Sequence, residues 1–271
     1  MSYTEKDVGD FFDQTTQTYL SFWDSDGVLH TGYFADDDDR DYRAAAERTS
    51  DLMAAEAGID GSSRVLDVGC GCGNFLIHLA RRYGCRGEGL DLSLERIKFA
   101  QQIADPGLGI EFRHGSATDM PYPDGGFSHV VSQDALFLVP DKPRSHAEIH
   151  RVLRPGGLFA FSDFLQPKKE IGERARRHVY DRVRWSSGYS LVEYQSALEQ
   201  AGFEIVLARN LESHIRQTYR VLGVTARERA ETTEEAAARD WMLAFAESCD
   251  EIQIAIDQGE FGWGIFVARK P

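Results

Sequence analysis

A glycine-rich segment follows a short apolar run, and together they read Val65-Leu66-Asp67-Val68-Gly69-Cys70-Gly71-Cys72-Gly73. Farther along the chain, Glu88-Gly89-Leu90 is closed by Asp91. This pattern predicts a strand, a tight turn, a helix and a second strand that ends in an acid. Glycines let a backbone approach a ligand where any Cβ would clash, and a carboxylate can accept two hydrogen bonds from a ribose. The segment therefore indicates a site for a cofactor that contains a nucleoside.

The spacing of these glycines separates two classes of nucleoside site. A dinucleotide site needs Gly-x-Gly-x-x-Gly, whose last glycine packs the helix on the strand beneath a pyrophosphate. Here the third glycine, Gly73, comes one residue early, and Asn74 stands at the expected position. Asp67 followed by three alternating glycines resembles the cofactor loop of class I S-adenosylmethionine-dependent methyltransferases. A nicotinamide-dependent oxidoreductase is disfavoured by this spacing, and a binding module without catalysis stays open.

Length and composition are typical of one globular domain with a sizeable insertion, since 42% of the 271 residues are hydrophobic. The sequence has no run of eighteen apolar residues and begins with a polar segment, so neither a membrane span nor a secretory signal is expected. The net charge of -14 argues against a nucleic-acid partner. We expect a small-molecule partner, and self-association stays open. The cysteines fit no disulfide framework and are expected as buried residues in a reducing cytoplasm: Cys70, Cys72, Cys85 and Cys249.

Short β-branched or aromatic runs alternate with helical stretches along the chain. The expected strands are residues 64–68, 87–92, 110–114, 127–132, 158–163, 203–208 and 261–268. The expected helices include residues 74–83, 93–104, 142–153 and 191–201, and Arg154-Pro155-Gly156-Gly157 is expected to stop the third. This alternation predicts an α/β fold with a doubly wound, mainly parallel sheet. The methyltransferase resemblance implies a seven-stranded Rossmann-like sheet that the last strand enters antiparallel.

Two segments fall outside this core. Residues 1–58 are rich in aromatic side chains, and residues 166–232 separate the fifth strand from the C-terminal part of the chain. Insertions of this kind lie at the carboxyl ends of the strands, where ligands bind in open α/β sheets. We therefore expect an N-terminal helical lid at 1–58, a cofactor-binding core at 59–165, and a helical substrate cap with the sixth strand at 166–232. A C-terminal helix and strand at 233–271 complete the core.

Motifs in the lid and core support a narrower resemblance. Phe12-Asp13-Gln14, Phe22-Trp23 and Leu29-His30-x-Gly32-Tyr33-Phe34 resemble the lid of small-molecule methyltransferases that include sarcosine/dimethylglycine, tocopherol, sugar and terpenoid enzymes. Ser132-Gln133-Asp134-Ala135, Pro140-Asp141, residues 151–157 and Ser162-Asp163 are most similar to the glycine-betaine members. The resemblance covers roughly residues 11–166. It departs at Leu138, where the betaine pattern carries a histidine.

The resemblance implies S-adenosyl-L-methionine as the cofactor. The glycines are expected to line its methionine portion, Asp91 its ribose, and Leu92, Ser116 and Ala117 its adenine. Many relatives have Asp where Ser116 stands. We therefore expect either that Ser116 makes a weaker contact with the adenine amino group, or that Asp119 makes the charged contact in its place. The expected cofactor-binding residues are Asp67, Gly69, Cys70, Gly71, Gly73, Asp91, Leu92, Ser116, Ala117, Gln133, Tyr19 and Tyr33.

The methyl acceptor is predicted from an apolar run and a basic segment. Residues 135–139 are apolar, and residues 168–184 hold seven cationic and three acidic side chains, a net charge of +4. A solvated helix face is one interpretation of these charges, and anion recognition by arginine is the other. Together the two features favour an amphiphilic anion such as an isoprenoid diphosphate, with Mg2+ if a diphosphate binds and Asp36–Asp39 as a candidate ligand run. The expected substrate-binding residues are Arg177, Arg174, Phe137, Leu138 and His30.

The mechanism follows from the cofactor, whose methyl group is already electrophilic, so that the protein mainly aligns the reactants. C-methylation of an alkene leaves a carbocation, from which a base must remove a proton. We expect Glu170 as that base and Gln133, at the end of the fourth strand, near the transferred methyl group. N-methylation of glycine, sarcosine or dimethylglycine and O-methylation of a natural product stay open as alternatives.

Overall fold

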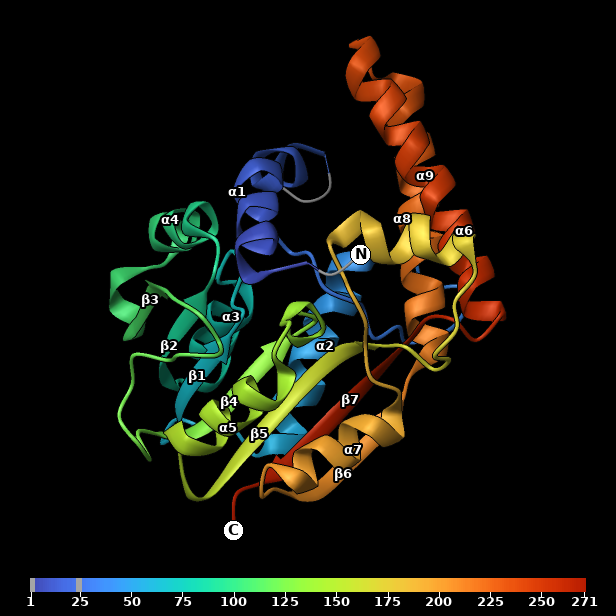
Figure 1. Ribbon diagram of the computed structural model, residues 1–271. Coiled ribbons are helices and arrows are strands. Elements are labelled where there is room, and N and C mark those ends of the chain that lie inside the picture. The colour runs from blue at the N-terminus through green and yellow to red at the C-terminus, as the bar shows by residue number, and fades with distance from the viewer. Residues whose placement is uncertain (1–2, 23–25) are drawn as a thin grey trace.

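The computed structural model describes residues 3–22 and 26–271, so Trp23 of the Phe22-Trp23 motif lies outside the described residues. The described residues form one seven-stranded sheet with the order β3-β2-β1-β4-β5-β7-β6 (Figure 1). All neighbouring pairs are parallel except those of β7 with β5 and β6. The predicted fold class is confirmed, including the antiparallel last strand. The strands are β1 Arg64–Val68, β2 Arg86–Asp91, β3 Ile110–His114, β4 Phe127–Gln133, β5 Leu153–Leu165, β6 Glu204–Asn210 and β7 Gly262–Arg269.

Helices cover both faces of the sheet. Buried side chains of α2, α3, α4, α8 and α9 belong to the core on one face, and those of α5 and α7 belong to the core on the other. Helix α1 packs on α4 instead, and the short α6 precedes a π-helical turn, Arg176–Tyr180, and a 3-10 turn, Asp181–Val183. The helices are α1 Glu5–Phe22, α2 Tyr42–Ala57, α3 Asn74–Tyr83, α4 Leu94–Ile103, α5 Lys142–Val152, α6 Glu173–Ala175, α7 Leu191–Gln200, α8 Glu212–Thr232 and α9 Ala236–Asp257.

The two cores follow from the two-residue period of the strands. Val65 and Leu66 are adjacent in β1 and belong to opposite cores, as do Val130 and Val131 in β4. Both faces are buried, so these strands read as nearly continuous apolar runs rather than as alternating ones. The strand that differs most from its predicted bounds is β5. It starts at Leu153 instead of residue 158, because Leu153 pairs with Phe127 of β4 and the glycines after it, Gly156 and Gly157, exchange backbone hydrogen bonds with Lys270.

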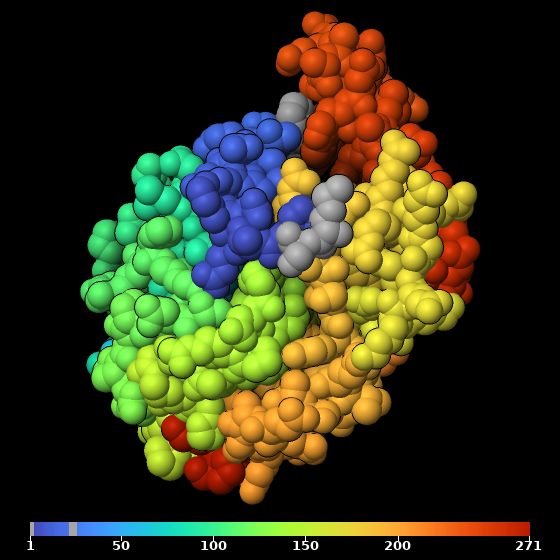
Figure 2. All heavy atoms as spheres, viewed as in Figure 1, coloured from blue at the N-terminus to red at the C-terminus, as the bar shows by residue number. Residues whose placement is uncertain are grey.

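The two segments outside the core lie near the carboxyl ends of the strands only in part. Helix α1 lies between the green part of the chain and the yellow cap in Figure 2. Helix α2 instead packs on β5 and β7, and α8 pairs with α9 in a long hairpin that projects beyond the sheet (Figure 1). Among the described helices, none combines the length and the apolar character that a membrane span requires.

A buried polar cluster lies between α5 and the sheet. Lys142 donates from Nζ to the carbonyls of Phe137, at 2.9 Å, and Val139, at 2.9 Å. Burial lowers the pKa of Lys142 to about 8, and burial raises that of Asp163, which accepts a hydrogen bond from Tyr194, to about 7. Lys142 therefore fastens the segment that follows β4, and this segment faces the cavity described below.

The fully buried His146 makes the fold sensitive to acid. Burial and the nearby Lys142 lower the pKa of His146 to about 4 from 6.5, and neither ring nitrogen has a hydrogen-bond partner among the described residues. The unfolded chain thus binds a proton at a higher pH than the folded one, and stability falls as the pH drops from 6.5 towards 4. Between pH 7 and pH 5 this histidine is expected to remove about 2 kcal/mol.

Urea unfolding of the protein and of His146→Phe at pH 7 and pH 5 measures this contribution. The difference in the free energy of unfolding between the two proteins should shrink, or reverse in sign, at pH 5. His146 takes up a proton when the unmodified protein unfolds, and the phenylalanine that replaces it cannot. Equal losses of stability in both proteins on acidification would contradict a buried neutral histidine.

Candidate functional site

The glycine turn between β1 and α3 has the geometry that its sequence predicts. Gly69, Gly71 and Gly73 have φ angles of 73°, 54° and 83°, in the left-handed region that side chains disfavour. An added Cβ at Gly69 would lie 2.5 Å from the Cβ of Ala135. The backbone N–H groups of Gly69 and Cys70 both donate to the carbonyl of Leu90, at 2.7 and 3.1 Å. These two hydrogen bonds hold the turn against the neighbouring strand β2.

Asp91 ends β2 next to this turn. Its Oδ2 accepts from the N–H of Gly71 at 2.8 Å, and its Oδ1 accepts from the N–H of Ser93 at 2.8 Å. Each carboxylate oxygen can accept a further hydrogen bond, because it carries two lone pairs. The backbone therefore fixes the carboxylate while leaving acceptor capacity for ligand hydroxyl groups.

An open cavity of about 1420 Å3, its mouth included, lies over the carboxyl ends of β1, β2 and β4. The glycine turn and Asp91 line it from the sheet, α1 lines it from above, and the cap lines it from the far side. Its lining extends from Ser116, after β3, to Arg182 in the cap, so it borders both the expected cofactor residues and the expected acceptor residues. Of the sequence-predicted residues, the cavity is lined by Asp67, Gly69, Cys70, Gly71, Asp91, Leu92, Ser116, Ala117, Gln133, Tyr19, Phe137, Leu138 and His30.

Asp67 gives the cavity an uncompensated buried acid. Its Oδ2 has no hydrogen-bond partner in the described part of the chain, and burial, together with Asp91, raises its pKa well above the usual range. A cationic ligand group would stabilise the ionised form, and the amino acid part of S-adenosylmethionine carries such an ammonium group. Burial and the same acids raise the pKa of Cys70, so its thiol stays neutral. The turn and Asp67 therefore fit this cofactor.

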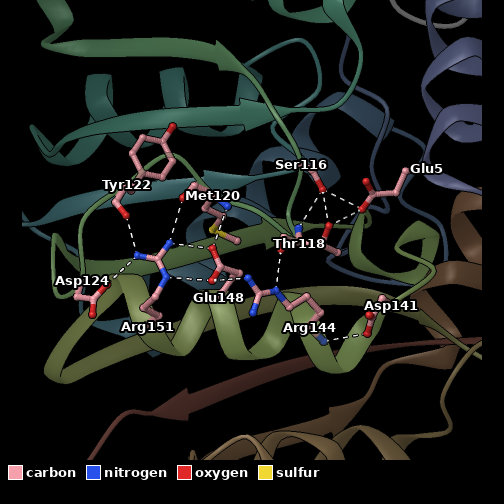
Figure 3. Close-up of polar contacts among 10 residues, drawn as sticks. All are labelled: Glu5, Ser116, Thr118, Met120, Tyr122, Asp124, Asp141, Arg144, Glu148 and Arg151. Carbon is pink, nitrogen blue, oxygen red and sulfur yellow. Dashed lines mark hydrogen bonds and ion pairs between the residues drawn. The ribbon is translucent and has the colours of Figure 1, made fainter.

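The loop after β3 brings Ser116 to a lid residue that the sequence did not single out. Glu5, in the first turn of α1, lines the cavity and accepts hydrogen bonds from Ser116 Oγ at 2.8 Å and Thr118 Oγ1 at 2.9 Å (Figure 3). Asp119 is exposed and does not line the cavity. The acid beside Ser116 thus comes from the N-terminal helix rather than from the same loop.

The end of β4 carries two polar side chains with different environments. Gln133 donates from Nε2 to Ser50 Oγ at 3.2 Å, and its Oε1 has no hydrogen-bond partner within the described residues. Asp134 has a φ of 49° and accepts from the N–H of Thr31, Ser162 Oγ and Trp263 Nε1, each at 2.7 Å. Asp134 thereby joins the N-terminal segment to β5 and β7, and Gln133 lines the cavity with a buried acceptor oxygen that no described residue uses.

The far end of the cavity is apolar and holds one cation from the cap. Phe137 and Phe164, whose ring centroids lie 4.5 Å apart, form an aromatic wall, and Val183 also lines this end. Arg182 donates to the carbonyl of His178 and to Tyr219 Oη, both at 3.2 Å, and makes no ion pair with any described residue. Burial disfavours its charge but Tyr219 and Tyr19 favour it, and the net effect raises the pKa of Arg182. The guanidinium therefore stays charged in this apolar surrounding.

Two residues expected at the cofactor serve packing instead. Gly73 caps α3, and an added Cβ there would lie 2.7 Å from the ring of Phe112, so it permits close packing of the turn on β3. Tyr33 stacks on His214 of α8 at 4.1 Å, which turns its ring away from the cavity. The structure does not bring either residue to the cavity.

The residues expected on the charged end of the substrate also lie elsewhere. Glu170 and Arg177 are exposed, and Arg174 pairs with Glu251 of α9 at 2.9 Å. None of the three lines the cavity, because the cap turns Arg182 inward instead. In the acidic run, Asp36 accepts hydrogen bonds from the N–H groups of Asp38 and Asp39, and Asp39 pairs with Arg48. Across residues 3–22 and 26–271, no three His, Cys, Asp or Glu side chains form a group that could hold a metal ion.

The cavity residues that belong to irregular or distant segments have weak signals in the sequence. Arg182 was counted among the cations of residues 168–184 but was not chosen, because the π-helical and 3-10 turns give no regular period from which an inward face can be read. Glu5 carries no signal except its place in the polar segment at residues 1–10. Phe12, whose ring lies 4.1 Å from the Arg96 guanidinium, was quoted only as part of a motif.

Comparison with known proteins places this geometry in a family. Residues 65–157 match the family described as "Methyltransferase domain". The chain is 28% identical over 277 residues to 27-O-demethylrifamycin SV methyltransferase of Amycolatopsis mediterranei (strain S699), covering 99% of this chain and 98% of that protein. It is 29% identical over 258 residues to sarcosine/dimethylglycine N-methyltransferase of Halorhodospira halochloris, covering 93% and 91%.

A solved structure extends the similarity over the whole fold. The [4+2]-cyclase SpnF superposes with a TM-score of 0.81 and 26% identity, covering 100% of this chain and 97% of that one. The similar proteins carry names for different reactions and acceptors, so they agree on the fold and the methyltransferase family but not on a substrate. With the glycine turn, Asp91 and Asp67 at its cavity, the chain belongs to the class I S-adenosylmethionine-dependent methyltransferases that act on small molecules.

Proposed function

We propose that this enzyme transfers a methyl group to a largely apolar small molecule that carries one anionic oxygen, and that Arg182 holds that oxygen. The observation that carries the proposal is a half-buried guanidinium without an ion pair among the described residues, which lines the same cavity as the rings of Phe137 and Phe164. An anionic ligand stabilises a partly desolvated cation, whereas a neutral ligand leaves its charge uncompensated. The proposed acceptor is therefore amphiphilic.

The number of cations favours a single anionic oxygen over a diphosphate. A diphosphate carries several negative charges, and its expected partners Arg174 and Arg177 lie outside the cavity. Arg96 also lines the cavity, but its guanidinium lies over the ring of Phe12 and beside Gly71 of the glycine turn, where an added Cβ would be 3.6 Å from it. An oxygen nucleophile, as in O-methylation of a natural product, thus suits the cavity better than an isoprenoid diphosphate does.

The cofactor is assigned to the opposite end of the cavity. We propose that the glycine turn and Asp67 hold the methionine part, with the Asp67 carboxylate facing its ammonium group. Asp91 accepts from the ribose hydroxyls, and Leu92 and Ala117 contact the adenine. Bound S-adenosylmethionine supplies a methyl group on a sulfonium, which is already electrophilic.

The remaining task of the protein is to align the acceptor oxygen and to remove its proton. Arg182 favours the ionised acceptor by its charge. His30 lines the cavity, and its Nε2 lies 3.2 Å from the carbonyl of Ala46. A carbonyl can only accept, so the neutral ring carries its proton on Nε2 and its lone pair on Nδ1. We propose His30 as the base in place of Glu170, and Gln133 as an acceptor that orients the bound molecules through its Oε1.

A panel of acceptors tests the proposal. Methyl transfer from methyl-labelled S-adenosylmethionine is measured on a hydroxynaphthoquinone, on an aryl carboxylic acid, on geranyl diphosphate, and on sarcosine and dimethylglycine. We expect methylation of the apolar acidic acceptors. Arg182→Met should lower kcat/KM for them by about 30-fold or more, since an interaction with a half-buried charge is lost.

The matched control is Arg177→Met, which removes an exposed arginine of the same cap. It should leave kcat/KM unchanged, and both variants should bind S-adenosylhomocysteine as the unmodified enzyme does. Methylation of only the amino acids, or turnover of geranyl diphosphate that Arg182→Met leaves intact, would overturn the assignment of Arg182.

A further inference from the structure

The sheet order predicts where the nucleobase of the cofactor lies. The glycine turn follows β1, Asp91 ends β2, and β3 is the next strand outward. A ribose on Asp91 with the methionine part over the glycine turn directs the base away from β1, towards the loop that follows β3. Gly115, Ser116 and Ala117 of this loop line the cavity, and so do Val8 and Gly9 of α1. The base would therefore lie between this loop and the first turns of α1.

The Ser116 hydroxyl can offer the base little. It donates to Glu5, it accepts from the N–H of Thr118 at 3.0 Å, and it lies 2.8 Å from Thr118 Oγ1, whose own hydrogen goes to Glu5. A hydroxyl has one donor and two acceptor positions, so Ser116 keeps one neutral acceptor position. The 6-amino group of adenine donates two hydrogens, so this position alone cannot satisfy it.

Glu5 offers a further acceptor. Both hydroxyl contacts of its carboxylate go to Oε1, and Oε2 contacts no hydrogen-bond donor in the described part of the chain. The residue lines the cavity beside Ser116. An ionised carboxylate oxygen is the stronger kind of acceptor for an N–H group. Its free oxygen is thus available at the edge of the loop where the base lies.

The loop that holds Glu5 is itself fastened to α5 by charged side chains (Figure 3). Arg144 donates from Nε to the carbonyl of Thr118 at 3.0 Å. Glu148 accepts from the N–H of Met120 at 2.9 Å, and Arg151 donates to the carbonyls of Met120, at 3.0 Å, and Tyr122, at 2.7 Å. The loop therefore presents the Ser116 and Thr118 hydroxyls in fixed positions, and they orient the Glu5 carboxylate.

A second contact fixes α1 without touching the loop. Asp13 accepts from Ser93 Oγ at 2.6 Å and from the N–H of Glu95 at 3.2 Å, at the start of α4. Asp13 does not line the cavity. Glu5 and Asp13 thus both attach α1 to the core, but only Glu5 can reach a ligand.

We propose that Glu5, carried by the N-terminal helix, recognises the 6-amino group of the cofactor's adenine and so selects adenosine over deaminated nucleosides. The helix that covers the cavity then contributes to cofactor specificity as well as to enclosure. This role requires only the cofactor of the family and does not depend on the identity of the acceptor.

Two ligands that differ only at the 6-position of the base test the proposal. Dissociation constants for S-adenosylhomocysteine and S-inosylhomocysteine are measured by isothermal titration calorimetry on the full chain. We expect the unmodified enzyme to prefer the amino ligand by about ten-fold or more, because a charge-assisted hydrogen bond is replaced by repulsion between oxygens. Glu5→Gln should bring the ratio close to one, since an amide can pair with either base.

Asp13→Ala is the matched control. It loosens the same helix, so both ligands should bind more weakly while their ratio stays at the unmodified value. A purely structural role of Glu5 predicts the same behaviour for Glu5→Gln. A retained ratio in Glu5→Gln, or an unmodified enzyme that binds both ligands equally, would overturn the proposal.

Discussion

The substitution Asp91→Ala is expected to weaken the binding of S-adenosylhomocysteine by about 1.5 to 3 kcal/mol, or about ten- to 150-fold. The change removes the proposed acceptor for the ribose hydroxyls. It also frees the N–H groups of Gly71 and Ser93, which donate to Asp91 in the structure. The glycine turn loses part of its support at the same time, so the effect should fall towards the upper end of this range. Calorimetric titration measures it.

Asp119→Ala is the control for this prediction, because Asp119 is an exposed acid that does not line the cavity. It should bind S-adenosylhomocysteine as the unmodified enzyme does. Unchanged affinity in Asp91→Ala, with circular dichroism that shows a folded protein, would refute the cofactor site proposed at the end of β2.

The substitution Asp134→Ala is expected to lower the free energy of unfolding by about 3 to 5 kcal/mol. Three donors lose a carboxylate, and two of them, on Ser162 and Trp263, belong to fully buried side chains. Alanine is also disfavoured at a φ of 49°. Urea unfolding followed by tryptophan fluorescence measures the loss, with the exposed Asp240→Ala of α9 as a control that should change little.

Asp134→Asn distinguishes the hydrogen bonds that Asp134 makes to the sheet from the one that it makes to the N-terminal segment. Asparagine tolerates a positive φ and keeps one oxygen for Ser162 and Trp263, but its NH2 group then faces the N–H of Thr31. Stability should fall less than in the alanine variant, while the amide hydrogen of Thr31 should exchange faster. Equal protection of the Thr31 amide in both proteins would show that Asp134 does not hold the N-terminal segment.

The fold could be predicted because its signals are local. The buried strands are continuous apolar runs, and the turn glycines stand where a side chain would clash, so β1 and α3 have the predicted bounds. The early start of β5 could not be predicted, because Pro155 and the glycines after it are typical of a turn. Their hydrogen bonds to Lys270 form only when the last strand of the chain pairs with β5.

In the candidate site too, residues on regular elements could be predicted, and residues placed by irregular turns or tertiary contacts could not. Asp67, Asp91 and the end of β4 belong to regular elements whose register can be counted, and they line the cavity as expected. Arg182 follows a π-helical turn, which breaks the α-helical period. The positions of Arg174 and Arg177 therefore do not indicate that Arg182 faces the cavity. Glu5 reaches the cavity because α1 docks on α4, which is a tertiary contact that no local pattern encodes.

The position of the first helix has a practical consequence for handling the protein. The N–H of Tyr3 donates to Ser186 Oγ in the cap at 2.7 Å, two residues before Glu5, whereas β7 ends at Arg269 on the side of the sheet away from the cavity (Figure 1). An affinity tag fused ahead of Tyr3 would crowd the cap and the mouth of the cavity. Purification tags and surface-immobilisation handles therefore belong after β7, and binding constants measured with an N-terminal fusion should be compared with those of the cleaved protein.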